Sequence, residues 1–242
     1  MKPTVPRLLV CLAVLLTWPP TNGVLFAQTY DQSDDVPLGQ EPYGHLQARL
    51  ERTIFMVDVL SLDLCFDSAT ATAIGSAVEA PAGDDAARDE VARVALGAPR
   101  ALGVVEFLRD VSLDQFLDGI GADHDRAVRA GMLDDSTRNA LRTDLRDWYG
   151  FLEGRGIRDG DRIGYRFAPD RVRTTYVGVE GQTHLDRIAR GTQRRASVLG
   201  AYFAPGASLR EGLIDSVLEV REPRDGPGRC SALSTAWVTG SP

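Results

Sequence analysis

The order of the expected elements predicts an α+β fold, in which a layer of helices covers one face of a mostly antiparallel sheet. Two apolar strand-like segments, at residues 53–66 and 102–111, are each followed by helical patterns. Three short strands separated by tight turns come next, which is typical of an antiparallel meander. A last helix completes what we expect to be one domain, since the chain is long enough to bury a single large core.

The first 27 residues are typical of a secretory signal, because a basic start precedes a short apolar run from Leu8 to Trp18 and cleavage is expected after Ala27. We therefore expect a periplasmic or secreted protein with no stable membrane span after cleavage. The expected divisions are a signal peptide at 1–27, a flexible linker at 28–42, the domain at 43–220 and a disordered tail at 221–242.

The first strand carries an acid within an apolar face. Alternate residues from Thr53 to Phe66 are almost all large hydrophobes, namely Ile54, Met56, Leu60, Leu62, Leu64 and Phe66. Asp58 falls at one of the same positions, and a period of two would turn its carboxyl group to the same side. A buried acid must be paired, protonated or facing a cavity, so Asp58 predicts a pocket. The alternative is a bulge near Asp58 that turns the carboxyl group to solvent.

Helices are expected on both sides of the second strand. Residues 67–73 and 84–96 precede it, and the second of these segments has acids at its start and stops at Gly97. Ser112 is expected to cap the helix that follows the strand. The apolar stripe of that helix consists of Leu113, Phe116, Leu117 and Ile120.

The clearest helix runs from Asp135 to Leu152, where apolar residues recur at intervals of four, three and four. Gly154 and Gly156 are expected to end it. The meander strands are expected at 162–167, 172–179 and 182–188, and the last helix at 209–218. The arginines at 187, 190, 194 and 195 are expected to lie on a solvated loop, with an anionic partner as the alternative.

Composition and spacing exclude several classes of function. The net charge of −7 and pI near 5.0 leave no basic footprint for nucleic acid. The histidines at 45, 124 and 184 stand far apart with no other ligand at metal spacing, so no metal or cofactor is expected. No nucleophile motif assigns a catalytic residue. An oxidising compartment would permit a disulfide between Cys65 and Cys230, and their spacing alone does not show whether it forms.

Four segments in this order resemble the chalcone isomerase family, including its non-catalytic fatty-acid-binding and bacterial exported relatives. They are the strand at 55–64, FLRDVSLDQF at 107–116, GDRIGYRFAPD at 160–170 and YFAPGASLREGLIDSVL at 202–218. The resemblance covers roughly residues 44–218. It implies a chalcone isomerase-like fold with a ligand held between sheet and helices.

The resemblance also implies a set of site residues. Catalytic members contact their substrate through an arginine, a strand threonine, a helix tyrosine, an asparagine and a hydroxyl on the last helix. The matching positions here are Arg49, with Arg52 as second choice, Asp58, Phe116, Asp123 and Ser216. An enolate needs donors or positive charge, yet Asp58 would repel it and Phe116 has no hydroxyl group. The chain is thus expected to be a non-catalytic member.

The expected function is binding of a small apolar or lipid-like molecule between sheet and helices. Fatty-acid-binding relatives hold a carboxylate with an arginine and tyrosine pair, of which this chain keeps only the arginine. With Asp58 in the site, a neutral or cationic amphipathic ligand would suit it better. The alternatives are an intramolecular lyase or isomerase of this family acting on an unknown substrate, and an envelope interaction protein with a vestigial pocket and unknown protein partners.

Overall fold

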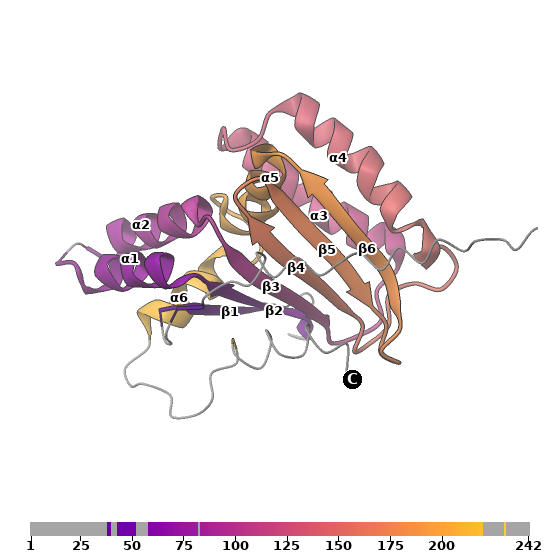
Figure 1. The fold of residues 1–242 in the computed structure, drawn as a ribbon, viewed down its shortest axis with the longest axis horizontal. Coiled ribbons are helices and arrows are strands. Elements are labelled where there is room, and N and C mark those ends of the chain that lie inside the picture. Colours follow the sequence, from indigo (N-terminus) through magenta and orange to yellow (C-terminus); the bar gives the residue numbers. More distant parts are fainter. Residues whose placement is uncertain (1–37, 40–42, 52–57, 82, 220–229, 231–242) are drawn as a thin grey trace, which may run out of the picture. The chain divides into compact units, whose positions relative to one another are not determined.

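The computed structural model describes residues 38–39, 43–51, 58–81, 83–219 and 230 (Figure 1). The expected signal peptide lies outside the described residues. So does Arg52, the second choice for the site arginine. Of the expected linker and tail, the structure describes only Leu38, Gly39 and Cys230.

The centre of the fold is a six-stranded sheet in which every strand is antiparallel to the next, in the order β1-β2-β3-β4-β5-β6. The strands are β1 (His45–Glu51), β2 (Asp58–Phe66), β3 (Ala101–Phe107), β4 (Arg162–Ala168), β5 (Arg171–Val177) and β6 (Thr183–Arg190). The predicted meander is confirmed as β4 to β6. The second predicted strand ends at Phe107, four residues earlier than expected.

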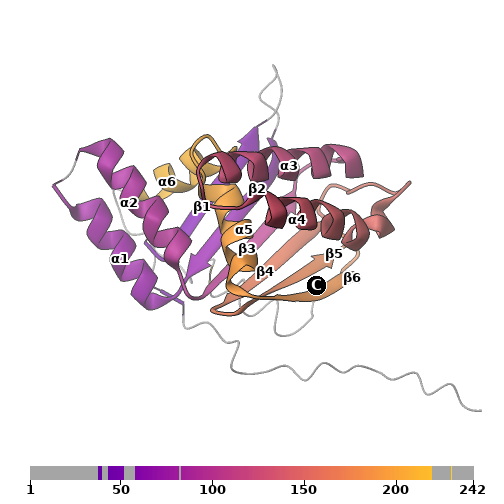
Figure 2. The same ribbon diagram turned by 90° about the horizontal axis from the view of Figure 1, so that it is seen from above.

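The helices are α1 (Ser68–Glu79), α2 (Asp84–Gly97), α3 (Leu113–Arg129), α4 (Asp135–Trp148), α5 (Thr192–Phe203) and α6 (Arg210–Leu218). A short 3-10 helix at Gly150–Leu152 continues α4. The pair α1 and α2 connects β2 to β3, and the pair α3 and α4 connects β3 to β4. Figures 1 and 2 show α3, α4 and α5 on one side of the sheet, which confirms the predicted α+β class with one covered face.

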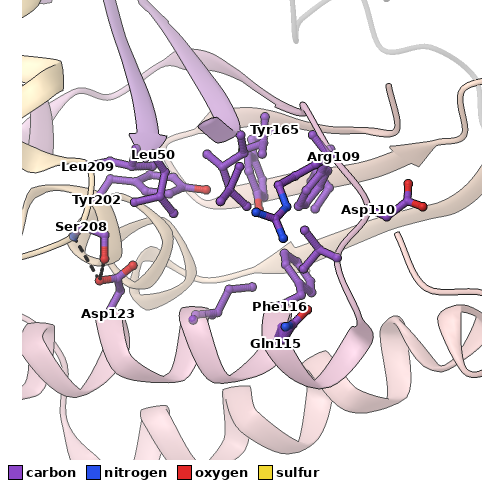
Figure 3. Close-up of a pocket in the computed structure, with 18 residues that line it drawn as sticks. Leu50, Arg109, Asp110, Gln115, Phe116, Asp123, Tyr165, Tyr202, Ser208 and Leu209 are labelled. Atoms are coloured by element: carbon purple, nitrogen blue, oxygen red, sulfur yellow. Dashed lines mark hydrogen bonds between the residues drawn. The ribbon is translucent and has the colours of Figure 1, made fainter. Parts of the chain in front are cut away.

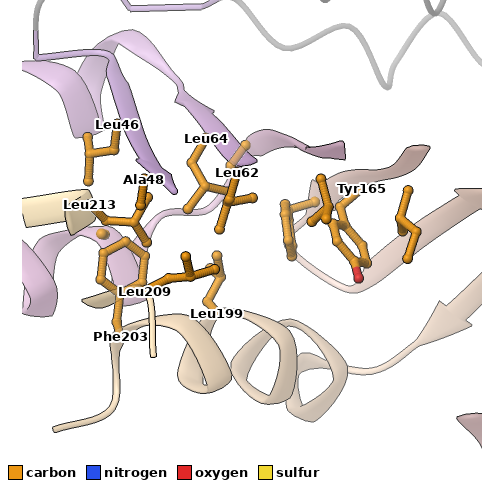
Figure 4. Close-up of a cluster of buried hydrophobic side chains, with 14 of the residues drawn as sticks. Leu46, Ala48, Leu62, Leu64, Tyr165, Leu199, Phe203, Leu209 and Leu213 are labelled. Atoms are coloured by element: carbon orange, nitrogen blue, oxygen red, sulfur yellow. The ribbon is translucent and has the colours of Figure 1, made fainter. Parts of the chain in front are cut away.

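The main core fills the space between the covered face of the sheet and the helices. Leu62 and Leu64 of β2 lie opposite Phe203, Leu209 and Leu213, which come from α5, the following loop and α6 (Figure 4). All five side chains are 5% exposed or less. Because alternate residues of a strand point to opposite faces, the even-numbered positions of β2 supply this core.

The opposite face of the sheet carries a disulfide. Cys65 and Cys230 are bonded, with sulfur atoms 2.05 Å apart, and both are buried beside Leu102 and Leu38. Cys65 is one of the odd-numbered positions of β2 and therefore points away from the main core. The pairing that the sequence left open is thus present, and Cys230, within the expected tail, is attached to the sheet.

Two elements had no counterpart among the predicted ones. The first is β1, the edge strand that pairs with β2. The second is α5, which occupies part of the expected arginine-rich loop. Arg194 lies in its first turns and pairs with Asp144 of α4, with Nη2 and Oδ2 2.7 Å apart. The loop expectation is therefore wrong for residues 192–195, because α5 packs against α3 instead.

Candidate ligand-binding site

A cavity of about 260 Å³ lies between the covered face of β1 to β4 and helix α3 (Figure 3). Most of the residues around it are apolar, and the polar ones gather in a few places. The lining residues are Leu50, Val59, Leu60, Val105, Phe107, Arg109, Asp110, Val111, Gln115, Phe116, Gly119, Ile120, Asp123, Ile163, Tyr165, Tyr202, Ser208 and Leu209.

Helix α3 supplies one wall. Phe116, Gly119, Ile120 and Asp123 are spaced by three, one and three residues, so they share one face of the helix. The start of α3 is fixed by Ser112. Its hydroxyl oxygen accepts a hydrogen bond from the backbone N–H of Gln115, and the Gln115 side-chain oxygen accepts one from the backbone N–H of Ser112. The predicted cap is confirmed. It sets the rotation with which this helix faces the sheet.

A β-bulge in β2 shapes the opposite wall. Leu60 pairs with Leu50, but Asp58 pairs with Glu51, so Val59 is an extra residue on β2. A bulge re-aims neighbouring side chains, and Val59 and Leu60 accordingly both line the cavity. The expectation that Asp58 shares a face with Leu60 is therefore wrong, because the bulge reverses the alternation at this point.

The bulge turns Asp58 to the other face of the sheet, where it meets Arg49. The Arg49 Nη1 and Asp58 Oδ2 atoms are 3.1 Å apart, and the two side chains are 61% and 27% exposed. Neither residue is among those that line the cavity. Two of the five predicted site residues therefore contact each other outside it.

Ser216 also lies away from the cavity. Its hydroxyl oxygen accepts a hydrogen bond from the backbone N–H of Gln47 at 3.0 Å, and its O–H donates to the Leu213 carbonyl at 2.6 Å. Gln47 belongs to β1, whose outer edge has no neighbouring strand among the described residues. Ser216 thus supplies a hydrogen-bond acceptor for the Gln47 N–H on an edge strand, so its role is structural.

Phe116 and Asp123 do line the cavity, as their predicted role requires. Phe116 packs edge-on against Phe107, with ring centroids 5.8 Å apart. Asp123 accepts from both the backbone N–H and the hydroxyl of Ser208, at 3.2 and 3.1 Å (Figure 3). It also pairs with Arg126. Its charge is therefore balanced, and it joins α3 to the loop before α6.

Arg109 was not predicted as a site residue. It lies on the short connection between β3 and α3, and Figure 3 shows its guanidinium turned into the cavity above Phe116. The connection is fixed on both sides of Arg109, because the Leu108 N–H donates to Val59 and residues Val111 and Ile157 exchange backbone hydrogen bonds. The backbone that carries Arg109 is therefore fixed.

Arg109 has no ion-pair partner within the described part of the chain. The side chain of its neighbour Asp110 points away in Figure 3, and that carboxylate accepts from the backbone N–H of Asp159 at 3.0 Å. Asp123 pairs with Arg126 and the Asp110 carboxylate points away, so Arg109 is the one cationic group among the described residues that line the cavity.

Tyr165 of β4 and Tyr202 of α5 are two further polar lining residues that were not predicted. Their rings meet edge-on with centroids 6.5 Å apart, and Figure 3 shows both hydroxyl groups directed into the cavity. Burial raises the pKa of both phenols above the ordinary value. They are therefore neutral hydrogen-bond donors at physiological pH.

The described residues contain no group of three or more His, Cys, Asp or Glu side chains arranged to hold a metal ion. They also include no helix long and apolar enough to cross a membrane.

Comparisons with known proteins add little to this description. No family model and no curated protein matches the chain. Among solved structures it is similar to a fatty-acid binding protein of Arabidopsis thaliana, with 11% sequence identity and a TM-score of 0.49, over 72% of this chain and 87% of that one. At these values we draw no conclusion from the likeness, and membership of the chalcone isomerase family stays a prediction.

Proposed function

We propose that the protein is an exported, non-catalytic binding protein whose cavity takes the apolar part of a small amphipathic molecule. The observation that carries the proposal is the cavity itself, enclosed by hydrophobic side chains from β1 to β4 and α3. Its volume of about 260 Å³ is just below the range of ~300–1,000 Å³ that is usual for drug-sized ligands, so the ligand is small.

The charges around the cavity favour an anionic or strongly polar head group. The preference for a neutral or cationic ligand depended on Asp58, which lies on the other face of the sheet with Arg49. Arg109 instead presents a guanidinium at the cavity. A planar guanidinium with several N–H donors suits a carboxylate or another anionic oxygen group.

The two alternative functions receive less support. A vestigial pocket would be filled by its own side chains, whereas side chains leave about 260 Å³ of this cavity unfilled. Catalysis on a developing enolate at the predicted positions would need a donor at Phe116, which has none.

Fluorescence titration with N-phenyl-1-naphthylamine, a neutral apolar probe, tests the proposal. We expect saturable binding with one site per chain, and displacement by undecanoate more strongly than by undecanol. Arg109→Met keeps an unbranched apolar stem and removes the charge, so the affinity for undecanoate should fall about tenfold while that for undecanol changes little. A probe that does not saturate would contradict the proposed function, and an unchanged undecanoate affinity in Arg109→Met would contradict the role of Arg109.

A further inference from the structure

A second, smaller cavity of about 80 Å³ lies beside the first, between α3, α4, α5 and the sheet. Four residues line both cavities, and two of them are Tyr165 and Tyr202. Tyr149, which follows α4, lines the smaller one. The hydroxyl-bearing rings of three tyrosines therefore stand where the two cavities meet.

These three tyrosines, which we name the tyrosine trio, are close enough to affect one another. Burial is the main cause that raises the pKa of Tyr149 and Tyr202, and in both cases the neighbouring Tyr165 adds to it. The rings of Tyr165 and Tyr202 are in direct edge-on contact, with centroids 6.5 Å apart. None of the three hydroxyls hydrogen-bonds to a described group outside the trio.

Counting donors shows that the trio is incomplete. Three phenols carry three O–H protons, and a chain of hydrogen bonds running from one hydroxyl to the next would use only two of them. At least one O–H donor is left over, and leaving a buried donor unpaired is unfavourable. Since Tyr165 and Tyr202 line both cavities, the leftover donor faces the space that a ligand would fill.

The neighbouring charge selects the kind of acceptor. The Asp123 carboxylate lies near enough to Tyr202 to contribute to the raised pKa of that phenol. The ion pair with Arg126 does not cancel the effect of Asp123 on Tyr202, so a second anion at the trio would be repelled, whereas an uncharged oxygen would not. Arg109 on the other side of Phe116 remains the place for a charged group.

We propose that the tyrosine trio donates a hydrogen bond to an uncharged oxygen of the ligand, such as a carbonyl or ether, so that the natural ligand is an oxygenated rather than a purely hydrocarbon molecule. The inference rests on the proposed function, because it names the chemistry of a ligand in the same cavity. It adds a second recognition point, inside the cavity, to the one at Arg109.

The test compares butylbenzene and butyrophenone, which differ only in that a carbonyl group replaces one methylene. Both are measured by displacement of N-phenyl-1-naphthylamine from the wild type, Tyr165→Phe, Tyr202→Phe and the double variant. We expect the double variant to lose about tenfold in affinity for butyrophenone while butylbenzene binds as well as before or better. Each single variant should lose less, because the other hydroxyl can still donate. Tyr43→Phe, which removes a phenol at the other end of the sheet, is the matched control and should change neither value.

Three other outcomes would overturn the inference. Equal losses for both compounds would mean that the tyrosines only shape the cavity. Unchanged affinities in the double variant would mean that no ligand oxygen contacts the trio. If the wild type bound neither compound nor the fluorescent probe, the proposed function would fall together with the inference, and this result is distinguishable from the first two.

Discussion

Arg49 and Asp58 form an ion pair between neighbouring strands, with 3.1 Å between Nη1 and Oδ2, on the face of the sheet opposite the cavity. The pair exists because Val59 is an extra residue in β2 and reverses the side on which Asp58 emerges. The acid that interrupts the apolar pattern is thus neutralised near the surface. The bulge that produces this arrangement also brings Val59 into the cavity wall.

Asp58→Ala is expected to have little effect on binding. Exposed ion pairs contribute about 0–1 kcal/mol, and Arg49 is 61% exposed, so the free energy of unfolding should fall by no more than this. Affinity for N-phenyl-1-naphthylamine should stay within about twofold of the wild type, because Asp58 does not line the cavity. Urea titration and probe titration measure the two quantities, and a large loss of affinity would show that the face assignment of Asp58 is wrong.

Ser216→Ala should affect stability and leave binding unchanged. The substitution leaves the N–H of Gln47 on the edge strand without its acceptor, which costs about 1 kcal/mol in the free energy of unfolding. Ser216→Thr, which keeps the hydroxyl group, is the matched control and should lose less. If Ser216→Ala weakened binding of the probe while its unfolding curve was unchanged, Ser216 would belong to the site after all.

Asp161 is expected to make stability depend on pH. It is fully buried and accepts from Tyr176 at 2.6 Å and from the backbone N–H groups of Arg158 and Val179. Burial by itself would raise the pKa of this carboxyl, but the hydrogen bonds and the nearby Arg155 outweigh it, so the pKa is lower than usual. A carboxyl whose pKa is lower in the folded state stabilises the fold above its unfolded pKa of about 4, and this contribution disappears as the pH falls through the folded pKa.

Asp161→Asn should therefore destabilise the protein by about 2–4 kcal/mol at pH 7, where the charged acceptor is fully present. The difference between variant and wild type should shrink below about pH 4, since the carboxyl is protonated first in the unfolded chain and in the folded protein only at its lower pKa. Urea unfolding at pH 7 and pH 3 measures both values. Asp159→Asn, which changes a neighbouring exposed acid, is the control. If the difference in the free energy of unfolding between Asp161→Asn and the wild type stayed constant with pH, the role given to the Asp161 charge would be contradicted.

Reduction of the Cys65–Cys230 disulfide should lower stability. The bond joins residues 165 apart in sequence, and a cross-link over a long loop removes entropy from the unfolded chain. We expect the reduced protein to lose about 2–5 kcal/mol in the free energy of unfolding, measured by urea titration with and without dithiothreitol. Cys230→Ser should show the lower value in both conditions, and a further effect of the reductant on this variant would point to another cause.

The class of fold follows from local patterns, and most elements were predicted from them. Strand β1 escaped prediction although Leu46, Ala48 and Leu50 alternate with polar residues, because Ala48 contributes little hydrophobicity and leaves the alternation weak. Helix α5 has an arginine-rich start that suggested a solvated loop. Tertiary packing of its apolar side decides its conformation, and a local pattern does not report this.

The site was less predictable than the fold because it depends on partners distant in sequence. Phe116 and Asp123 were predicted from the family resemblance, and both line the cavity from α3. The bulge at Val59 is a property of how β2 pairs with β1, so the sequence of β2 alone does not reveal it. Arg109 was assigned to a strand, and it reaches the cavity because β3 ends at Phe107. Tyr165 was expected to lie in a strand, but its meeting with Tyr202 needs the assembled fold.

The most direct test of the central claim, that the cavity holds an apolar ligand, is the binding of N-phenyl-1-naphthylamine to Gly119→Leu. Gly119 lines the cavity on α3, and a methyl group added there would meet no heavy atom within 4 Å. The leucine side chain should therefore fill the cavity without disrupting the fold, and replacing a helical glycine should also stabilise the protein by up to about 1 kcal/mol.

Gly121→Leu is the matched control, since its side chain would face Arg142 of α4, whose Nη2 lies 3.6 Å from the added methyl position. The account predicts that Gly119→Leu unfolds at least as late in urea as the wild type and loses tenfold or more in probe affinity, about 1.4 kcal/mol, while Gly121→Leu keeps its affinity. Full probe binding by a folded Gly119→Leu would contradict the account.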